Sequence, residues 1–287
     1  MKVLVTGSRG MLGKQVVLEY QKRGAQVYGL TRHELDITDM EQVQAVLKKI
    51  RPDTVLNCAA YTDVDGAEKE KAKAFLINGL GPRFLALACR QYEAELVHIS
   101  TDYIFDGESD RPYQIYDTPR PINVYGASKL FGEASVRETG GRFYIARTSW
   151  LFGPGGKNFV DTILNLARER EQLIVVNDQQ GSPTYTVDLA GALADLVDGK
   201  VYGTYHITNS GFTTWYGLAK KIIQTAALKT SVQSCTTSDF PSPAARPGNS
   251  VLDPFPLAQV IGYTLPCWED AVERYVKGNA LTDGVGL

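Results

Sequence analysis

The sequence predicts an α/β protein built on a doubly wound parallel sheet. Apolar segments of strand length alternate with amphipathic segments of helix length through the first 150 residues. The first apolar segment, residues 2–7, leads into a glycine-rich turn and then into a helix-like segment. Because strands that alternate with helices form right-handed crossovers, we expect a parallel sheet with helices on both faces.

The first half contains five expected strands, at residues 2–7, 25–31, 54–60, 95–101 and 143–150. Helices are expected between them, at residues 11–24, 40–50, 83–92 and 124–137. Gly24 suits the end of the first helix and Asp39 the N-cap of the second. Pro52 stops the second helix, and Pro82 fits the first turn of the third.

Beyond Trp150 the alternation loosens, which predicts a second, smaller lobe. Helices are expected at residues 159–170 and 187–199, and strands at residues 172–176 and 203–209. Residues 239–256 are rich in proline, which bars regular helix and favours a loop-rich surface.

Composition excludes several classes of partner. Lys and Arg total 30 against 32 Asp and Glu, so a net charge of −2 offers no basic surface for nucleic acid or an anionic membrane. No apolar run reaches the ~18 residues of a membrane span, and the first residues do not resemble a secretory signal. We therefore expect a cytoplasmic protein that binds a small molecule. The sequence contains four cysteines: Cys58, Cys89, Cys235 and Cys267. Their spacing fits neither a disulfide framework nor a zinc site, so no metal site is expected.

Three glycines form a motif between the first strand and the first helix. Gly7, Gly10 and Gly13 follow one another at three-residue intervals. Glycines there let the backbone approach a pyrophosphate at the positive end of the helix. The spacing differs from the more familiar G-x-G-x-x-G, and an ordinary tight turn is the alternative. We predict a Rossmann-type dinucleotide-binding domain over residues 1–150, with Met11 and Leu12 also at the cofactor.

The remaining residues, 151–287, are predicted to form mainly a substrate-binding lobe. Segments around residues 185–225 are expected to return to the first domain.

The end of the second expected strand bears on the choice of cofactor. An acidic residue there would bind a ribose 2′-hydroxyl and favour NAD, but this strand ends in Thr31-Arg32. Arg32, and Arg9 within the glycine turn, favour the 2′-phosphate of NADPH. The alternative is that both arginines are solvated surface charges, and NADH stays open as a second donor.

Tyr125 and Lys129 lie four residues apart, on one face of an expected helix, with only small residues between them. We expect a nicotinamide riboside to lie across Gly126 and Ala127, with Lys129 on the ribose hydroxyls. The lysine charge should lower the phenol pKa from ~10 toward neutrality. The phenol would then protonate a carbonyl oxygen while a hydride reaches the carbon. A chance pair is the alternative, which the upstream glycine turn disfavours.

A third catalytic group is expected at the end of the fourth strand, where open α/β sheets bind their ligands. Thr101 is the candidate to hydrogen-bond the substrate carbonyl. A turn-forming role is its alternative, and Asp102 could merely anchor the loop.

Seven segments together resemble the dTDP-4-dehydrorhamnose reductases, in the extended branch of the short-chain dehydrogenase/reductases. The similarity runs in order through nearly the whole chain. The segments are TGSRGMLG, NCAAYTDVDGAE, ISTDYIFDG, VYGASKLFGE, RTSWLFGPGGKNFV, GSPTYTVDLA and ARPGNSVLD.

The resemblance implies NADPH-dependent reduction of the 4-keto group of dTDP-4-dehydro-L-rhamnose to dTDP-L-rhamnose, a sugar donor for surface polysaccharide. It implies catalysis by Thr101, Tyr125 and Lys129. Further cofactor contacts are implied for Asp36, Ile37, Ala59, Ala60, Tyr61 and Asn78. Sugar contacts are implied for Thr62, Val64, Asp102, Tyr103 and Trp150, and contacts with the nucleotide diphosphate for Asn158 and Arg246.

Two other functions fit parts of the pattern. A non-catalytic NADP-binding regulatory subunit, like the β subunit of methionine adenosyltransferase, would share the fold, but the intact catalytic trio argues against it. A nucleotide-sugar epimerase or dehydratase would retain NAD, for which no acidic residue is present. Some relatives dimerise through a carboxylate-bound magnesium, which Glu133 and its neighbours do not establish. The chain is expected to be a monomer or a homodimer.

Overall fold

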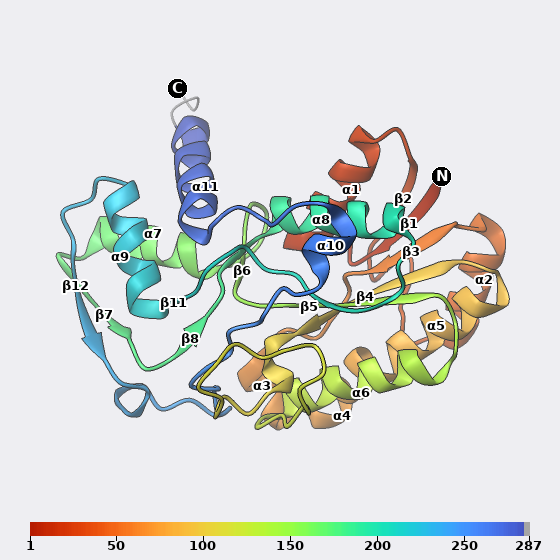
Figure 1. The fold of residues 1–287 in the computed structure, drawn as a ribbon, viewed down its shortest axis with the longest axis horizontal. Helices are drawn as coiled ribbons and strands as arrows, with labels where there is room; N and C mark the ends of the chain where they lie inside the picture. Colours follow the sequence, from red (N-terminus) through yellow and green to blue (C-terminus); the bar gives the residue numbers. More distant parts are fainter. Residues whose placement is uncertain (284–287) are drawn as a thin grey trace.

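A parallel sheet of six strands forms the centre of the structure, a computed structural model that describes residues 1–283 (Figure 1). In spatial order the strands are β10 (Gly203–His206), β5 (Phe143–Thr148), β4 (Glu95–Thr101), β3 (Thr54–Asn57), β1 (Lys2–Thr6) and β2 (Gln26–Leu30). The chain runs from β1 outward to β2 and then returns past β1 to β3, which makes a topological switch point beside β1. The predicted doubly wound α/β fold is confirmed.

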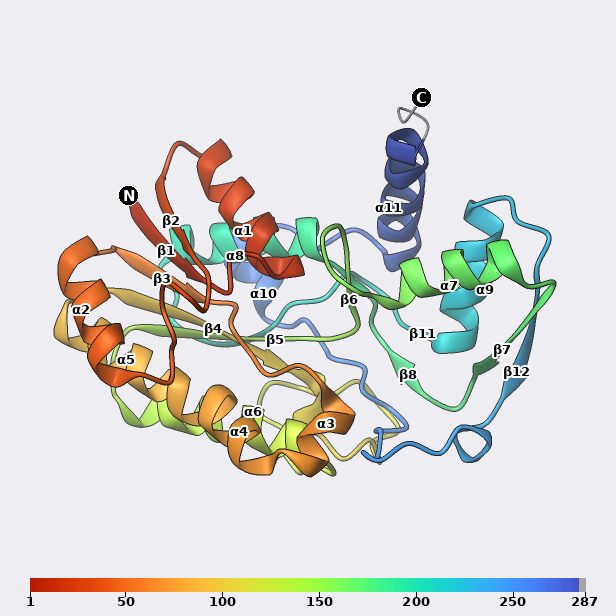
Figure 2. The same cartoon turned by 180° about the vertical axis from the view of Figure 1, so that it is seen from behind.

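Helices form one layer on each face of the sheet (Figure 2). Side chains of the central strands alternate between these two layers. Val3 and Val5 pack toward one layer and Leu4 toward the other, and all three are completely buried. This explains why the strands read as continuous apolar runs. The first layer comprises α1 (Met11–Lys22), α8 (Thr186–Gly199) and α10 (Leu257–Ile261). The second comprises α2 (Met40–Ile50), α5 (Gly81–Gln91) and α6 (Val124–Glu138).

The expected helix signals act where they were predicted. The Asp39 side chain accepts a hydrogen bond from the Gln42 amide, 3.0 Å away, and caps α2. Pro82 lies in the first turn of α5. Helix α1 ends at Lys22, and Gly24 follows with φ of +76°, a conformation that favours glycine.

Three short helical segments before α5 were not predicted. They are α3 (Val64–Lys69), α4 (Lys71–Phe75) and a π-helical turn (Leu76–Leu80). Segments of five or six residues are too short to show a helical period, so the sequence pattern could not reveal them. Two 3₁₀ turns, Asp102–Ile104 and Thr237–Asp239, were also unpredicted.

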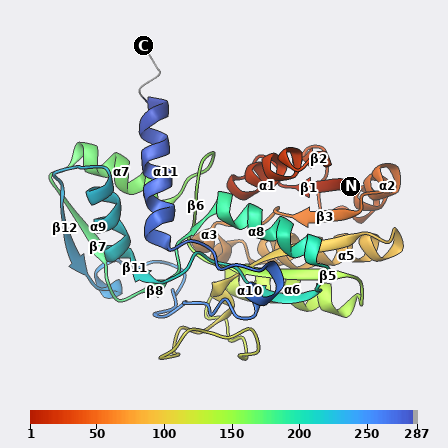
Figure 3. The ribbon, with the colours of Figure 1, turned by 45° about the horizontal axis from the view of Figure 1, so that its top comes forward.

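A second group of elements lies beside the carboxyl ends of the main-sheet strands (Figure 3). It has its own apolar cluster, formed by helices α7 (Phe159–Glu169), α9 (Trp215–Thr225) and α11 (Trp268–Asp283) with strands β7 (Gln172–Val176) and β12 (Ser231–Cys235). The sequence predicted α7 and β7. It did not predict β12, whose serines and glutamine blur any apolar alternation.

Two short strand pairs lie outside the main sheet. Strand β6 (Leu151–Phe152) pairs with β9 (Thr184–Tyr185), and β8 (Gln180–Gly181) pairs with β11 (Thr213–Thr214). From the range 185–225, α8 and β10 join the main sheet, whereas α9 packs in the second group. The domain boundary near residue 150 stays a prediction. Residues 240–256 contain no helix. None of the helices in the described part of the chain is long and apolar enough to cross a membrane.

Candidate active site

A cavity of about 920 Å³ opens at the carboxyl ends of the main-sheet strands. The chain crosses this edge repeatedly, so residues far apart in the sequence meet there. The structure brings together nineteen of the predicted residues on its wall: Gly7, Gly10, Met11, Leu12, Gly13, Arg32, Asp36, Ile37, Ala59, Ala60, Tyr61, Thr62, Val64, Thr101, Asp102, Tyr103, Tyr125, Lys129 and Trp150.

The glycine turn leaves no room for side chains. Gly7 has φ of +61°, and a Cβ there would lie 2.8 Å from the Ala59 nitrogen. A Cβ on Gly13 would lie 2.2 Å from the Gly7 carbonyl oxygen. Helix α1 begins directly after the turn and has no acidic residue in its first turn. This bare backbone at a positive helix end fits the pyrophosphate of a dinucleotide.

A cation lines the cavity beyond β2. The Arg32 side chain is 71% exposed, and its Nε lies 3.3 Å from Asp36 Oδ2. The nearby Glu34 carboxylate is held in a local turn, where it accepts hydrogen bonds from the Thr31 amide and hydroxyl at 2.9 and 2.8 Å. The residues present therefore fit a ribose that carries a 2′-phosphate.

The small residues of α6 have a different role from the predicted one. None of residues 126–128 is among the residues that line the cavity. A Cβ on Gly126 would lie 2.0 Å from the Tyr103 carbonyl oxygen, and Ser128 is fully buried. The expectation that Gly126 and Ala127 form a floor for the nicotinamide riboside is therefore wrong. Gly126 lets α6 pack closely against the turn that follows β4.

The predicted pKa of Tyr125 is also wrong in direction. Burial raises the pKa of the Tyr125 phenol to about 12, and a hydrogen bond with Thr101 opposes the rise. Lys129 is not among the groups that shift the phenol pKa, and its ammonium donates a 2.5 Å hydrogen bond to the Ile99 carbonyl oxygen. Burial lowers the pKa of Lys129 to about 8, and the negative charge of Glu133 opposes that shift.

Thr101 lies at the end of β4, next to the Tyr125 phenol. Its hydroxyl donates to Asp102 Oδ1 at 3.0 Å and accepts from the Tyr103 amide at 3.2 Å. Asp102 is 2% exposed, and burial raises its pKa to about 6. The Tyr103 and Tyr125 rings meet edge to face, with centroids 5.8 Å apart. Asp102 thus anchors the loop that presents the threonine hydroxyl.

A buried ion pair supports the same face of α6. Glu133 is one helical turn beyond Lys129 and has no exposed surface. Its two oxygens accept hydrogen bonds from Arg147 Nε and Nη2, both at 2.9 Å, and Oε1 also accepts from the Ser100 hydroxyl at 2.6 Å. Sequence reasoning considered Glu133 only for magnesium. Residues 1–283 contain no group of three or more His, Cys, Asp or Glu side chains suited to hold a metal ion.

Four predicted residues are not among those that line the cavity: Arg9, Asn78, Asn158 and Arg246. Asn78 is buried, accepts from the Tyr61 amide at 2.8 Å and donates to the Tyr61 carbonyl at 3.0 Å. Asn158 caps α7, and Arg246 forms a two-pronged ion pair with Asp65 at 2.7 and 2.8 Å. Their contacts with ligands stay predictions.

Sequence reasoning missed four residues on the cavity wall that come from the second part of the chain: Leu151, Gly156, Lys157 and Trp215. Trp215 begins α9, and its indole stacks on that of Trp150. No local motif connects residues so far apart, so the sequence pattern contained no signal for this contact.

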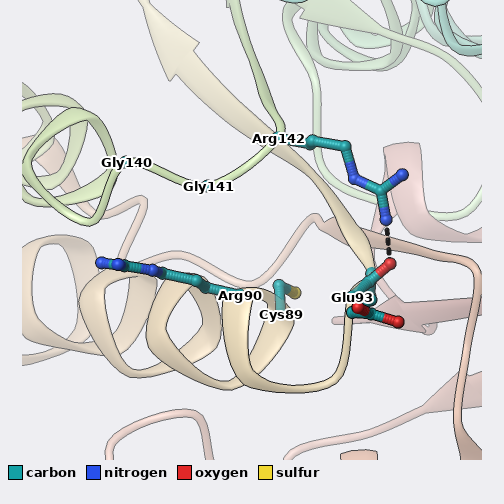
Figure 4. Close-up of a pocket in the computed structure, with 7 residues that line it drawn as sticks. Cys89, Arg90, Glu93, Gly140, Gly141 and Arg142 are labelled. Atoms are coloured by element: carbon teal, nitrogen blue, oxygen red, sulfur yellow. Dashed lines mark hydrogen bonds between the residues drawn. The ribbon is translucent and has the colours of Figure 1, made fainter.

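A second hollow, of about 550 Å³, lies near the start of β5 (Figure 4). Its two arginines hold backbone carbonyl groups: Arg142 donates to that of Glu93, and Arg90 donates to that of Thr139 at 2.7 Å. Burial raises the pKa of the Cys89 thiol on its wall. These contacts join α5 to the segment before β5, and they involve none of the predicted catalytic residues.

The fold and the cavity define a Rossmann-type α/β protein with a site suited to a dinucleotide. The chain belongs to the family described as RmlD substrate binding domain, whose family model matches residues 1–280.

Named relatives agree with this assignment. A dTDP-4-dehydrorhamnose reductase of Streptomyces griseus is 45% identical over 260 residues, which cover 87% of this chain and 84% of the relative. The spore coat polysaccharide biosynthesis protein SpsK of Bacillus subtilis (strain 168) is 41% identical over 276 residues, or 96% and 97% of the two chains. A crystal structure of dTDP-4-dehydrorhamnose reductase from Bacillus anthracis in complex with NADP is 43% identical, has a TM-score of 0.93, and is matched over 96% of this chain and 99% of that one. The resemblance inferred from the motifs is confirmed.

Proposed function

We propose that this protein is an NADPH-dependent reductase that converts the 4-keto group of dTDP-4-dehydro-L-rhamnose to the hydroxyl of dTDP-L-rhamnose. One observation carries the proposal: a single cavity contains the glycine turn, Arg32 and the trio Thr101, Tyr125 and Lys129. The names of the relatives support the substrate, and the NADP complex of the Bacillus anthracis relative supports the cofactor.

The residues of the cofactor end each have a distinct task. Backbone amides at the start of α1 bind the pyrophosphate, and Arg32 binds the 2′-phosphate. To bind the nicotinamide ribose, the Lys129 ammonium either breaks its hydrogen bond to the Ile99 carbonyl oxygen or keeps it and donates another hydrogen bond to the ribose. When bound, NADPH supplies the hydride for the sugar C4. Arg9 adds positive charge near the same phosphate.

The Tyr125 phenol holds the proton that the carbonyl oxygen needs. With a pKa of about 12, the phenol is fully protonated at neutral pH. As negative charge develops on the ketone oxygen, that oxygen becomes basic enough to take the proton from the phenol. The Thr101 hydroxyl turns from Asp102 to donate a second hydrogen bond to that oxygen. Thr101 is buried, whereas Tyr125 is half-buried on the cavity wall.

The other end of the cavity receives the sugar nucleotide. Thr62, Val64, Tyr103 and Trp150 line it. An indole and a phenol offer apolar surface for a pyranose ring together with polar groups for its hydroxyls. The product would serve the synthesis of surface polysaccharide, and we place the reaction in the cytoplasm.

A turnover assay tests the function. Purified protein is mixed with NADPH and enzymatically prepared dTDP-4-dehydrorhamnose, and the absorbance of the reduced nicotinamide is followed. We expect NADPH to be consumed only when the sugar nucleotide is present. The Tyr125→Phe variant should lose about 10²–10⁴-fold in kcat while its dissociation constant for NADPH stays unchanged. Binding of NADPH without any turnover would instead identify a regulatory subunit.

A further inference from the structure

Two tryptophans from different parts of the chain form a stacked pair on the cavity wall. The ring centroids of Trp150 and Trp215 lie 3.4 Å apart, and their planes are inclined by only 4°. Trp150 follows β5 of the main sheet, whereas Trp215 begins α9 of the second group. Both indoles line the cavity that contains the catalytic trio. The pair therefore links the two parts of the chain at the site itself.

The backbone of Trp150 is held in an uncommon conformation. Its φ is +46°, a region that bulky residues rarely adopt. A Cβ on Gly181 would lie 2.4 Å from the Trp150 ring, so only glycine leaves room for the indole in this position. Such a conformation persists only where surrounding contacts impose it.

Trp215 is itself fixed by two contacts in the second group. Its Nε1 donates to Gln179 Oε1 at 3.1 Å, and Gln179 in turn donates to the Thr237 hydroxyl at 2.9 Å. The Phe159 ring packs against the Trp215 ring with centroids 4.6 Å apart. Trp215 is thus anchored independently of Trp150 and can act as a fixed surface for it.

We propose that Trp215 is a positioning residue that orients the Trp150 indole against the sugar ring of the substrate. The inference rests on the proposed function and adds to it a residue that sets affinity for the sugar. Losing the stacked partner frees the Trp150 indole to rotate, so the sugar loses a preorganised apolar surface. The glycine turn and Arg32 lie outside this pair, so binding of NADPH should not change.

Steady-state kinetics and binding provide the first test. In Trp215→Ala we expect the KM for dTDP-4-dehydrorhamnose to rise about tenfold while kcat changes less than about threefold. Dissociation constants for NADPH and for dTDP alone should match wild type. Trp215→Phe keeps an aromatic ring and should recover most of the loss. If the dissociation constant for dTDP rises as much as KM, the tryptophan pair binds the nucleotide and not the sugar. If KM is unchanged, the pair contributes to binding of neither the sugar nor the nucleotide. Either result overturns the proposal.

Fluorine NMR provides a readout that does not depend on turnover. The chain has three tryptophans, so protein labelled with 5-fluorotryptophan should give three resonances. A stacked ring shifts the resonance of its neighbour, so Trp215→Ala, which removes that ring, should move the Trp150 signal and leave the Trp268 signal in place. If the Trp150 signal does not move, the two rings do not stack in solution, and the proposal fails even where the reductase assay succeeds.

Two further variants guard against trivial explanations. Trp268 is buried in the same part of the chain and is not among the residues that line the cavity, so Trp268→Phe should keep the wild-type KM. Gly181 does not have a left-handed φ, so Gly181→Ala is compatible with the backbone, and the atoms nearest to its Cβ are those of the Trp150 indole, which it would displace. It should reproduce the rise in KM with Trp215 intact. A wild-type KM in Gly181→Ala would contradict the proposal.

Discussion

The Lys129 ammonium donates a 2.5 Å hydrogen bond to the carbonyl oxygen of Ile99. Ile99 belongs to β4, the strand that ends at Thr101, so this bond ties α6, which carries Tyr125, to the strand that carries Thr101. Lys129 is 3% exposed, and burial lowers the pKa of its ammonium to about 8. The group that is proposed to bind the nicotinamide ribose therefore changes its charge near physiological pH.

We predict that kcat/KM falls as pH rises through about 8. Lys129 carries its proton below that pH and loses it above, while the Tyr125 phenol, with a pKa of about 12, remains protonated throughout. Because kcat/KM reports ionisations of the free enzyme, a pH profile measures this pKa directly. Lys129→Arg, whose side chain keeps its charge, should move the alkaline limb upward by more than one pH unit. An unmoved limb would assign it to another group.

The Thr101 hydroxyl should matter only in the reaction. Thr101→Val removes the hydrogen bond to the developing oxyanion, and we expect kcat to fall about 10²-fold with little change in KM. Thr101→Ser keeps the hydroxyl and is the matched control, with kcat within a few-fold of wild type. Steady-state kinetics compare the two. Equal losses in both variants would point to packing of the methyl group and not to the hydroxyl.

The glycine turn should not tolerate a methyl group at Gly13. A Cβ there would lie 2.2 Å from the Gly7 carbonyl oxygen, and backbone cannot move aside as a flexible side chain can. We expect Gly13→Ala to weaken NADPH binding more than tenfold, because the turn must open. Gly191 in α8 has no neighbouring atom within 4 Å of such a Cβ, so Gly191→Ala is the control and should bind normally. Calorimetric titration with NADPH measures both.

Glu133 should contribute to stability far more than a surface carboxylate on the same helix. Glu133→Gln leaves the buried Arg147 charge without its partner, and we expect a loss of about 3 kcal/mol in the free energy of unfolding. The carboxylate of Glu138, also in α6, is 67% exposed in its ion pair with Arg83. Glu138→Gln should cost less than about 0.5 kcal/mol. Urea unfolding of the two variants checks the contrast, and similar losses would show that burial of the pair is not decisive.

Arg32 should set the preference between the two nicotinamide cofactors. Arg32→Ala removes a cation that can pair with the 2′-phosphate, so KM for NADPH should rise about tenfold while KM for NADH stays constant. Arg23, which is held by Glu19 and Asp195 on α1 and α8, provides a control for loss of an arginine elsewhere. Kinetics with both cofactors give the ratio. A parallel rise for NADH would indicate a general effect on the cavity.

Much of the site was predictable because its signals are local. The spacing of Gly7, Gly10 and Gly13 reports a turn that backbone geometry dictates, and the four-residue interval from Tyr125 to Lys129 reports one face of a helix. Thr101 could be singled out because it lies at the end of an expected strand. Parallel strands bring their carboxyl ends, where ligands bind, to one edge of the sheet. These inferences need only short-range periods and the rules of strand connection.

Other features depend on contacts between distant segments. The small residues after Tyr125 suggested space for a ligand, but Gly126 instead packs against the Tyr103 carbonyl oxygen. The pKa of Tyr125 rises because the fold buries it, and Lys129 is drawn to the Ile99 carbonyl oxygen. Burial and partner choice follow from the packing of α6 on β4, which no local pattern contains.

By itself, the sequence determined the doubly wound fold and the glycine turn and singled out the proposed catalytic trio, because periodicity and residue spacing act over a few residues. Only the tertiary structure decided which side chains meet: the buried pair of Glu133 and Arg147, the stack of Trp150 on Trp215, and the engagement of Arg246 with Asp65. The physical reason is that close packing brings together residues separated by 14 to 181 positions in the sequence. The residues next to each partner in the sequence do not indicate which distant side chain it will contact.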